Sequence, residues 1–215
     1  MIISPGRGYI FVHIPKTGGT SLAAALEARA MADDILIGDT EKAVKRRGRV
    51  RKLQHRAAGR LWKHATLRDI SGVLPEADLN RLFVFCVVRN PWDRMVSYYH
   101  WLRAQSFAHP QVRLAQSETF TGFVTHPDTA RVIVRNPYES YTEDVSGQRC
   151  GLFLRLEHLD EDLDKLAQHI GFRPDVAHLN ASDRGPRYQD YYDAQTQEVV
   201  AHICAQEVAR FGYRF

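Results

Sequence analysis

Residues 9–29, with the sequence YIFVHIPKTGGTSLAAALEAR, decide the fold because they join a buried strand, a glycine loop and a helix. The apolar, β-favouring run Tyr9–Ile14 predicts a strand buried on both faces. Ser21–Arg29 is dominated by Ala and Leu and predicts a helix. Between them, Gly18 and Gly19 let the backbone turn sharply and approach a ligand closely. This order is typical of an anion site, because unpaired N–H groups and the positive end of the dipole meet at a helix N-terminus.

The side chains of the loop strengthen the prediction of a phosphate or sulfate cradle over that of an ordinary turn. Lys16 supplies a full positive charge, and Thr17, Thr20 and Ser21 supply hydroxyl donors. The ATP-binding P-loop has the pattern G-x-x-x-x-G-K-[ST], in which the lysine follows the glycines. Here Lys16 precedes both glycines, so that pattern does not fit.

A second strand-to-helix junction carries its own candidate phosphate ligands. Leu82–Arg89, with the sequence LFVFCVVR, predicts a buried strand, and the Asn-Pro pair after it predicts the start of a helix. Its final arginine lies where ligands of open α/β sheets collect, and Ser97 lies two helical turns further on. A guanidinium fork with a hydroxyl suits a phosphate monoester. The alternative is that Arg89 pairs with Asp93 and that Ser97 is an ordinary surface residue.

Together the two motifs resemble a known family. PKTGGTS, residues 15–21, resembles the 5′-phosphosulfate loop of sulfotransferases that use 3′-phosphoadenosine 5′-phosphosulfate (PAPS). VVRNPWDRMVSYYHW, residues 87–101, looks like the 3′-phosphate-binding strand and helix of the carbohydrate-type members, the uronosyl 2-O-sulfotransferase-like group and its bacterial relatives. The resemblance implies that the residues contacting PAPS are Lys16, Thr17, Gly18, Gly19, Thr20, Ser21, Arg89, Ser97, Ser182 and Arg184.

The resemblance also implies a catalytic base between the two motifs. The segment KHATLRDI contains His64, with Lys63 before it and Arg68 after it. A single histidine is more often structural, but in related enzymes a histidine in this interval deprotonates the acceptor hydroxyl. Histidine suits that task because its ordinary pKa lies near neutrality. His55 is the second candidate, and His13 is expected to be structural.

Length and composition predict one α/β domain covering residues 1–215, a P-loop-like fold whose central, mainly parallel sheet is flanked by helices. The apolar content of 44% and charged content of 25% are those of an ordinary globular protein. No run of about 18 apolar residues and no signal peptide is found, so we expect the cytoplasm of a bacterium. Cys86, Cys150 and Cys204 are expected to be reduced thiols rather than disulfides or metal ligands.

The charge is concentrated in one segment. The net charge is +4, and residues 42–68 hold eleven basic residues and no acid. The segment predicts either a solvated basic helix or loop, or a strip that holds an anionic substrate beside the site. Nucleic-acid binding is less favoured, because Trp62 is the only aromatic residue there apart from histidines.

These observations predict a sulfotransferase that moves a sulfuryl group from PAPS to an acceptor hydroxyl, with a saccharide expected as acceptor. His64 would remove the proton and Lys16 would stabilise the leaving oxygen, with no metal required. The alternatives are an ATP-dependent small-molecule kinase and a non-catalytic protein that binds polyanions or nucleic acid.

Overall fold

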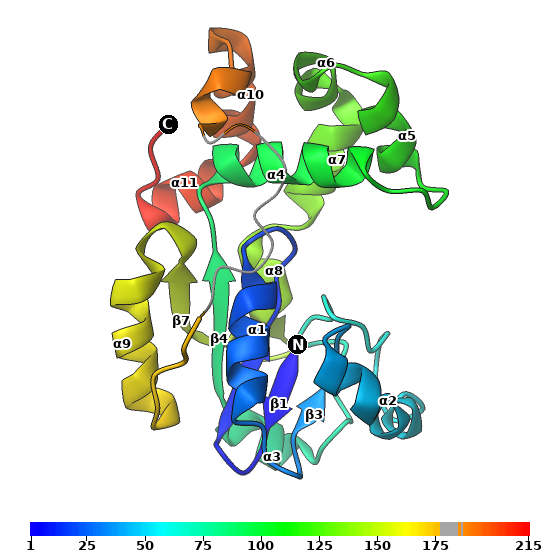
Figure 1. Ribbon diagram of the computed structural model, residues 1–215, viewed down its shortest axis with the longest axis vertical. Helices are drawn as coiled ribbons and strands as arrows, with labels where there is room; N and C mark the ends of the chain where they lie inside the picture. The colour runs from blue at the N-terminus through cyan, green and yellow to red at the C-terminus, as the bar shows by residue number, and fades with distance from the viewer. Residues whose placement is uncertain (177–184, 186) are drawn as a thin grey trace. The chain divides into compact units, whose positions relative to one another are not determined.

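A computed structural model describes residues 1–176, 185 and 187–215 (Figure 1). The chain divides into two compact units, one formed by residues 1–88 and 138–180, the other by residues 89–137 and 181–215. One domain over residues 1–215 therefore stays a prediction. Ser182 and Arg184 lie outside the described residues. None of the helices in the described ranges is long and apolar enough to cross a membrane.

The first unit contains a five-stranded sheet in the order β3-β1-β2-β4-β7. Its strands are β1 (Ile2–Ser4), β2 (Tyr9–Val12), β3 (Ile35–Leu36), β4 (Phe83–Val88) and β7 (Cys150–Arg155). β4 pairs in parallel with β2 and with β7, whereas β1 runs antiparallel to β2 and β3. Four of the five strands therefore share one direction, which confirms the predicted mainly parallel sheet. A separate hairpin pairs β5 (Glu143–Asp144) with β6 (Gly147–Gln148).

Helices cover both faces of this sheet. The helical elements of the first unit are α1 (Gly19–Ala28), α2 (Glu41–Leu53), α3 (Glu76–Arg81), α8 (Tyr138–Thr142), the 3-10 turn η1 (Leu156–His158) and α9 (Leu159–Ile170). On one face, Leu22 of α1 and Leu166 of α9 pack in one cluster with Phe11 and Phe85 of the strands. The alternate β4 residue Cys86 is buried on the opposite face, where α8 contacts the strand. These contacts confirm the predicted α/β layering.

The described elements of the second unit are all helical. They are α4 (Pro91–Arg103), α5 (Pro110–Ser117), α6 (Phe120–Thr125), α7 (Pro127–Arg135), the 3-10 turn η2 (Tyr188–Tyr191), α10 (Ala194–Ile203) and α11 (Ala205–Phe211). Trp92 and Tyr99 of α4, Phe123 of α6 and Val200 of α10 are buried together in the core of this unit. The apolar residues of α4 recur at helical spacing, and they form the surface on which the surrounding helices pack.

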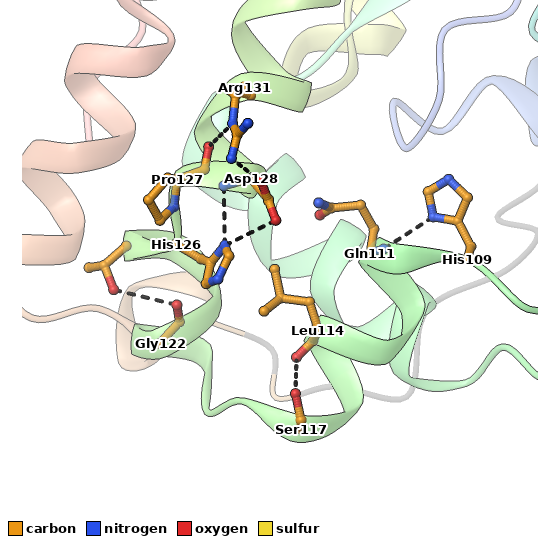
Figure 2. Close-up of polar contacts among 10 residues, drawn as sticks. His109, Gln111, Leu114, Ser117, Gly122, His126, Pro127, Asp128 and Arg131 are labelled. Atoms are coloured by element: carbon orange, nitrogen blue, oxygen red, sulfur yellow. Dashed lines mark hydrogen bonds and ion pairs between the residues drawn. The ribbon is translucent and has the colours of Figure 1, made fainter.

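Two helices of this unit begin with the same His-Pro pair (Figure 2). The backbone N–H of Gln111 donates to His109 Nδ1 at 3.2 Å, and that of Asp128 donates to His126 Nδ1 at 3.1 Å. The proline after each histidine occupies N1, where its missing N–H costs nothing. Each imidazole therefore acts as an N-cap, a role usually filled by Ser, Thr, Asp or Asn.

The observed elements differ from the predicted ones near the N-terminus. α1 begins at Gly19, two residues earlier than predicted, and the short strand β1 has no counterpart in the prediction. Near the other end of the chain, a break at Cys204 separates α10 from α11. Asp193 caps α10 through a 2.7 Å bond from the Thr196 N–H, as its sequence position predicts.

Candidate active site

The PKTGGTS loop connects β2 to α1 through two residues in the left-handed region. Lys16 has φ 66° and Gly18 has φ 81°. Glycine adopts this conformation without strain, whereas for lysine it costs about 1–3 kcal/mol and is seen mostly at functional sites. The left-handed conformation thus occurs at Lys16, the residue predicted to stabilise the leaving oxygen.

The two glycines are required by close packing as well as by backbone conformation. A Cβ atom on Gly18 would lie 2.7 Å from Cδ1 of Leu156, the first residue of η1, directly after β7. A Cβ atom on Gly19 would lie 2.4 Å from His13 Cδ2. The start of α1 is therefore fixed against the sheet by contacts that only glycine permits.

The first turn of α1 has the features of an anion site. Its N-cap, Gly18, offers no side-chain cap, and no acidic side chain lies in the first turn. The positive end of the helix dipole is therefore not neutralised locally. The buried Thr17 hydroxyl donates to the Ile14 carbonyl at 3.0 Å, so in this structure it braces the loop. The Ser21 N–H donates to the Gly18 carbonyl at 3.2 Å, which tightens the turn.

His64 lies beside this loop, in a turn closed by a 2.9 Å bond from the Ala65 N–H to the Trp62 carbonyl. Its Nδ1 lies 2.7 Å from the backbone carbonyl oxygen of His13. A carbonyl oxygen can only accept, so Nδ1 carries the proton and Nε2 has the lone pair. The ring centroids of His64 and His13 are 4.8 Å apart, and the same His13 ring packs on Gly19. His64 therefore has an unprotonated Nε2, and the His13 ring contacts both His64 and the start of α1.

Burial keeps both histidines neutral. Burial lowers the pKa of His64 to about 4, although the hydrogen bond to the His13 carbonyl acts in the opposite direction and raises it. Burial also lowers the pKa of His13 well below its usual value. His13 stacks on Phe11 and supports both Gly19 and His64, consistent with the structural role expected for it.

At the second junction, in the second unit, the predicted capping is present. The Trp92 N–H donates to Asn90 Oδ1 at 3.1 Å, and Pro91 is the first residue of α4. Arg89 pairs with Asp93 through Nε and Nη2, at 2.8 Å and 2.6 Å from Oδ2. The pairing that the sequence left as an alternative therefore exists, and it holds the guanidinium in a fixed orientation. Ser97 is buried within α4 rather than exposed.

The structure groups the candidate residues by unit. Residues 16–21 and His64 belong to the first unit, and Arg89 and Ser97 to the second. The strands that precede the two motifs, β2 and β4, are adjacent and parallel. His55, the second candidate base, lies exposed in the turn after α2. Among the described residues, no group of three or more His, Cys, Asp or Glu side chains could hold a metal ion.

The sequence did not indicate the supporting role of His13 or the position of Trp62. The Trp62 ring lies edge-on to His64, with centroids 5.1 Å apart, and its side chain is 42% exposed. Neither residue belongs to a motif, since the strand and the loop that carry them meet only in the folded chain.

A strand–loop–helix unit of this kind can hold an anionic group at the start of its helix. The model of the sulfotransferase family matches residues 1–196, and the chain belongs to that family. This match confirms the predicted family and the predicted class, a PAPS-dependent sulfotransferase, over the kinase and the polyanion-binding protein.

A crystal structure of mouse sulfotransferase SULT7A1 complexed with PAP is similar to the chain, with 17% sequence identity and a TM-score of 0.48. The match covers 94% of this chain and 84% of the mouse chain. No curated protein sequence matches this chain significantly.

Proposed function

We propose that this sulfotransferase moves the sulfuryl group of PAPS to a saccharide hydroxyl by in-line displacement, with His64 as the general base. The observation that carries this proposal is the 2.7 Å contact between His64 Nδ1 and the His13 carbonyl. With the proton on Nδ1, the lone pair that a base needs is on Nε2, and His13, whose carbonyl makes the contact, precedes the PKTGGTS loop by two residues.

In this mechanism His64 Nε2 takes the proton of the acceptor hydroxyl. The acceptor oxygen forms a bond to sulfur as the bond from sulfur to the bridging oxygen breaks, and adenosine 3′,5′-bisphosphate (PAP) leaves. Lys16 stabilises the charge that develops on the bridging oxygen, and the first-turn N–H groups of α1 hold the 5′-phosphate. Positioning and fixed charge thus supply most of the rate enhancement.

The remaining donor contacts come from the second junction. Arg89, oriented by Asp93, would bind the 3′-phosphate together with Ser97. Thr17, Gly18, Gly19, Thr20 and Ser21 complete the cradle for the 5′-phosphosulfate, with Thr17 acting mainly through its backbone. The contacts proposed for Ser182 and Arg184, and a cytoplasmic location, rest on the sequence alone.

Donor binding would also activate the base. The pKa of His64 is about 4 because burial disfavours the imidazolium. The anionic groups of PAPS would stabilise that imidazolium and raise the pKa towards neutrality. His64 would then be a stronger base in the complex that undergoes reaction than in the free enzyme.

The test is PAPS turnover against a panel of glycans, with His64→Ala, Lys16→Ala and His55→Ala proteins compared with wild type. Removal of His64 should lower kcat by about 10²- to 10⁴-fold, the usual contribution of a positioned base. Lys16→Ala should lower kcat similarly, because the leaving oxygen loses its cation. His55→Ala serves as the control and should retain full activity.

Full turnover by a folded His64→Ala enzyme would reassign the base. If no glycan in the panel accepts sulfate while another hydroxyl compound does, the saccharide part of the proposal is wrong.

A further inference from the structure

The basic helix α2 presents two different faces. On one face the cations are used internally: the Lys42 ammonium donates to the Glu27 carbonyl at 2.5 Å and the Arg46 guanidinium to the Met31 carbonyl at 2.6 Å. Arg49 likewise donates to the Ala32 carbonyl at 3.0 Å. These bonds attach α2 to the last turn of α1 and to the segment that follows it. They explain part of the basic segment as structure rather than as a binding surface.

The other face lines a cavity of about 320 Å³. Arg47, Val50 and Arg51 of α2 form one wall, and Trp62 with Lys63 forms another. This volume is at the lower end of the range found for small-molecule sites. A mixture of an aromatic surface, an aliphatic side chain and cations suits a ring-shaped polar ligand that carries negative charge.

The charge in this cavity is not balanced by the protein. Lys63 pairs with Asp39, which also lines the cavity. Within the described part of the chain, Arg47 and Arg51 make no hydrogen bond or ion pair through their side chains. These two arginines, four residues apart on one helix, line the same cavity. Such forks bind carboxylate or sulfate groups with paired hydrogen bonds.

The cavity adjoins the proposed catalytic base. Trp62 lines it, and the ring of Trp62 contacts that of His64. Ile37, Gly38 and Asp39 separate it from a small enclosed space lined by His13 and Thr20, at the start of α1. The cavity is therefore linked to the proposed base through Trp62, and to the start of α1 through the residues that line both spaces.

We propose that this cavity binds an anionic group of the acceptor, a carboxylate or sulfate on a sugar ring close to the reacting hydroxyl. The proposal rests on the saccharide acceptor proposed above and makes Arg47 and Arg51 its specificity-determining residues. Trp62 supplies the apolar surface for the ring.

The test measures binding and turnover of a glucuronic-acid-containing tetrasaccharide and of the same tetrasaccharide with its carboxylates reduced to alcohols. Titration calorimetry is carried out with PAP present, on wild type and on Arg47→Ala/Arg51→Ala. The double substitution should weaken binding of the acidic probe roughly 10- to 100-fold, as expected for loss of charge-assisted bonds. Binding of the reduced probe should change little, and KM should change far more than kcat.

Lys52→Ala is the matched control, because Lys52 is exposed on the same helix and does not line the cavity. It should retain wild-type affinity for both probes. Arg47→Lys/Arg51→Lys should restore part of the affinity, which separates a charge effect from a folding defect.

Equal affinity of wild type and Arg47→Ala/Arg51→Ala for the acidic probe, equal losses in Lys52→Ala, or no binding of that probe to wild type would each overturn the subsite. Binding of PAP is scored separately in the same titrations. A protein that binds PAP and sulfates only neutral sugars would keep the proposed function and lose the subsite, whereas absence of PAP binding would reject both.

Discussion

Gly19 and His13 determine each other's position at the start of α1. Gly19 has an ordinary helical conformation, so its lack of a side chain matters for space alone. A Cβ atom there would meet both Cδ2 and Nε2 of His13, at 2.4 Å and 2.8 Å. The His13 ring is buried and also packs on His64. The donor cradle and the proposed base are thus coupled through one imidazole.

We therefore predict that Gly19→Ala is destabilising, by roughly 1–3 kcal/mol as for other overpacked sites, and that it weakens PAP binding. The measurement is urea unfolding followed by titration with PAP. Gly48→Ala is the control, because Gly48 lies within α2 and a Cβ atom added there would meet no other atom within 4 Å. Alanine at that position should stabilise the protein by about 0.5–1 kcal/mol. An unchanged unfolding midpoint for Gly19→Ala would show that His13 moves aside without cost.

The lowered pKa of His64 predicts the acid limb of the pH profile. In the free enzyme His64 loses its lone pair only as pH falls through about 4. The logarithm of kcat/KM for PAPS reports the free enzyme. Protonation of His64 should therefore leave it level down to about pH 5 and lower it below that pH. The kcat profile should bend at a higher pH, because bound PAPS raises the pKa.

The control for this profile is the far-UV circular dichroism of the protein at each pH, which separates protonation from acid unfolding. An acid limb of kcat/KM near the ordinary pKa of histidine would mean that a more exposed histidine is the base.

At the scale of elements, the sequence predicts what depends on local pattern. The apolar runs at Tyr9–Ile14 and Leu82–Arg89 became β2 and β4. Gly171 and Gly212 end their helices with positive φ, as glycine at this position favours. β1 was missed because its three residues, Ile2–Ser4, are too few to show a period, and its place in the sheet comes from antiparallel pairing with β2.

Features that depend on tertiary packing could not be predicted. Cys86 and Cys150 are far apart in sequence, yet pairing of β4 with β7 brings their sulfur atoms to 3.7 Å. The sequence shows that residues 42–68 are basic. It does not show which of these side chains line the cavity, because that depends on how α2 packs. The break between α10 and α11 at Cys204 could not be predicted either, because neither glycine nor proline lies there.

The His-Pro caps give an element-scale prediction (Figure 2). His126→Ala should destabilise the second unit by about 1 kcal/mol, because the Asp128 N–H at the start of α7 loses its acceptor. Thermal unfolding would then shift down by roughly 2–4 °C for a chain of this size. His126→Asn keeps an acceptor at the cap and should remain near wild type. Equal losses in both variants would assign the effect to packing of the imidazole instead.

At the scale of the whole molecule, the two sequence motifs predict two separate groups of phosphate ligands. Residues 16–21 belong to one unit and Arg89 with Ser97 to the other, and each group follows one of two adjacent parallel strands. That both act on one nucleotide is a prediction of the sequence motifs. It requires that the two groups make separable contributions to binding, one for each phosphate.

Comparing PAP with 5′-AMP, which lacks the 3′-phosphate, separates these contributions. Wild type should prefer PAP, and Arg89→Ala should lose that preference, about 10- to 150-fold for a hydrogen bond to a charged group. Lys16→Ala should instead weaken both nucleotides by a similar factor and keep the ratio, because each carries the 5′-phosphate. Calorimetry measures the affinity of each protein for both nucleotides. Thermal unfolding provides an independent check of these affinities, because PAP at 100 times its Kd should stabilise wild type by about 2.7 kcal/mol. If Arg89→Ala weakens AMP as much as PAP, Arg89 does not contact the 3′-phosphate, and its pair with Asp93 serves α4 alone.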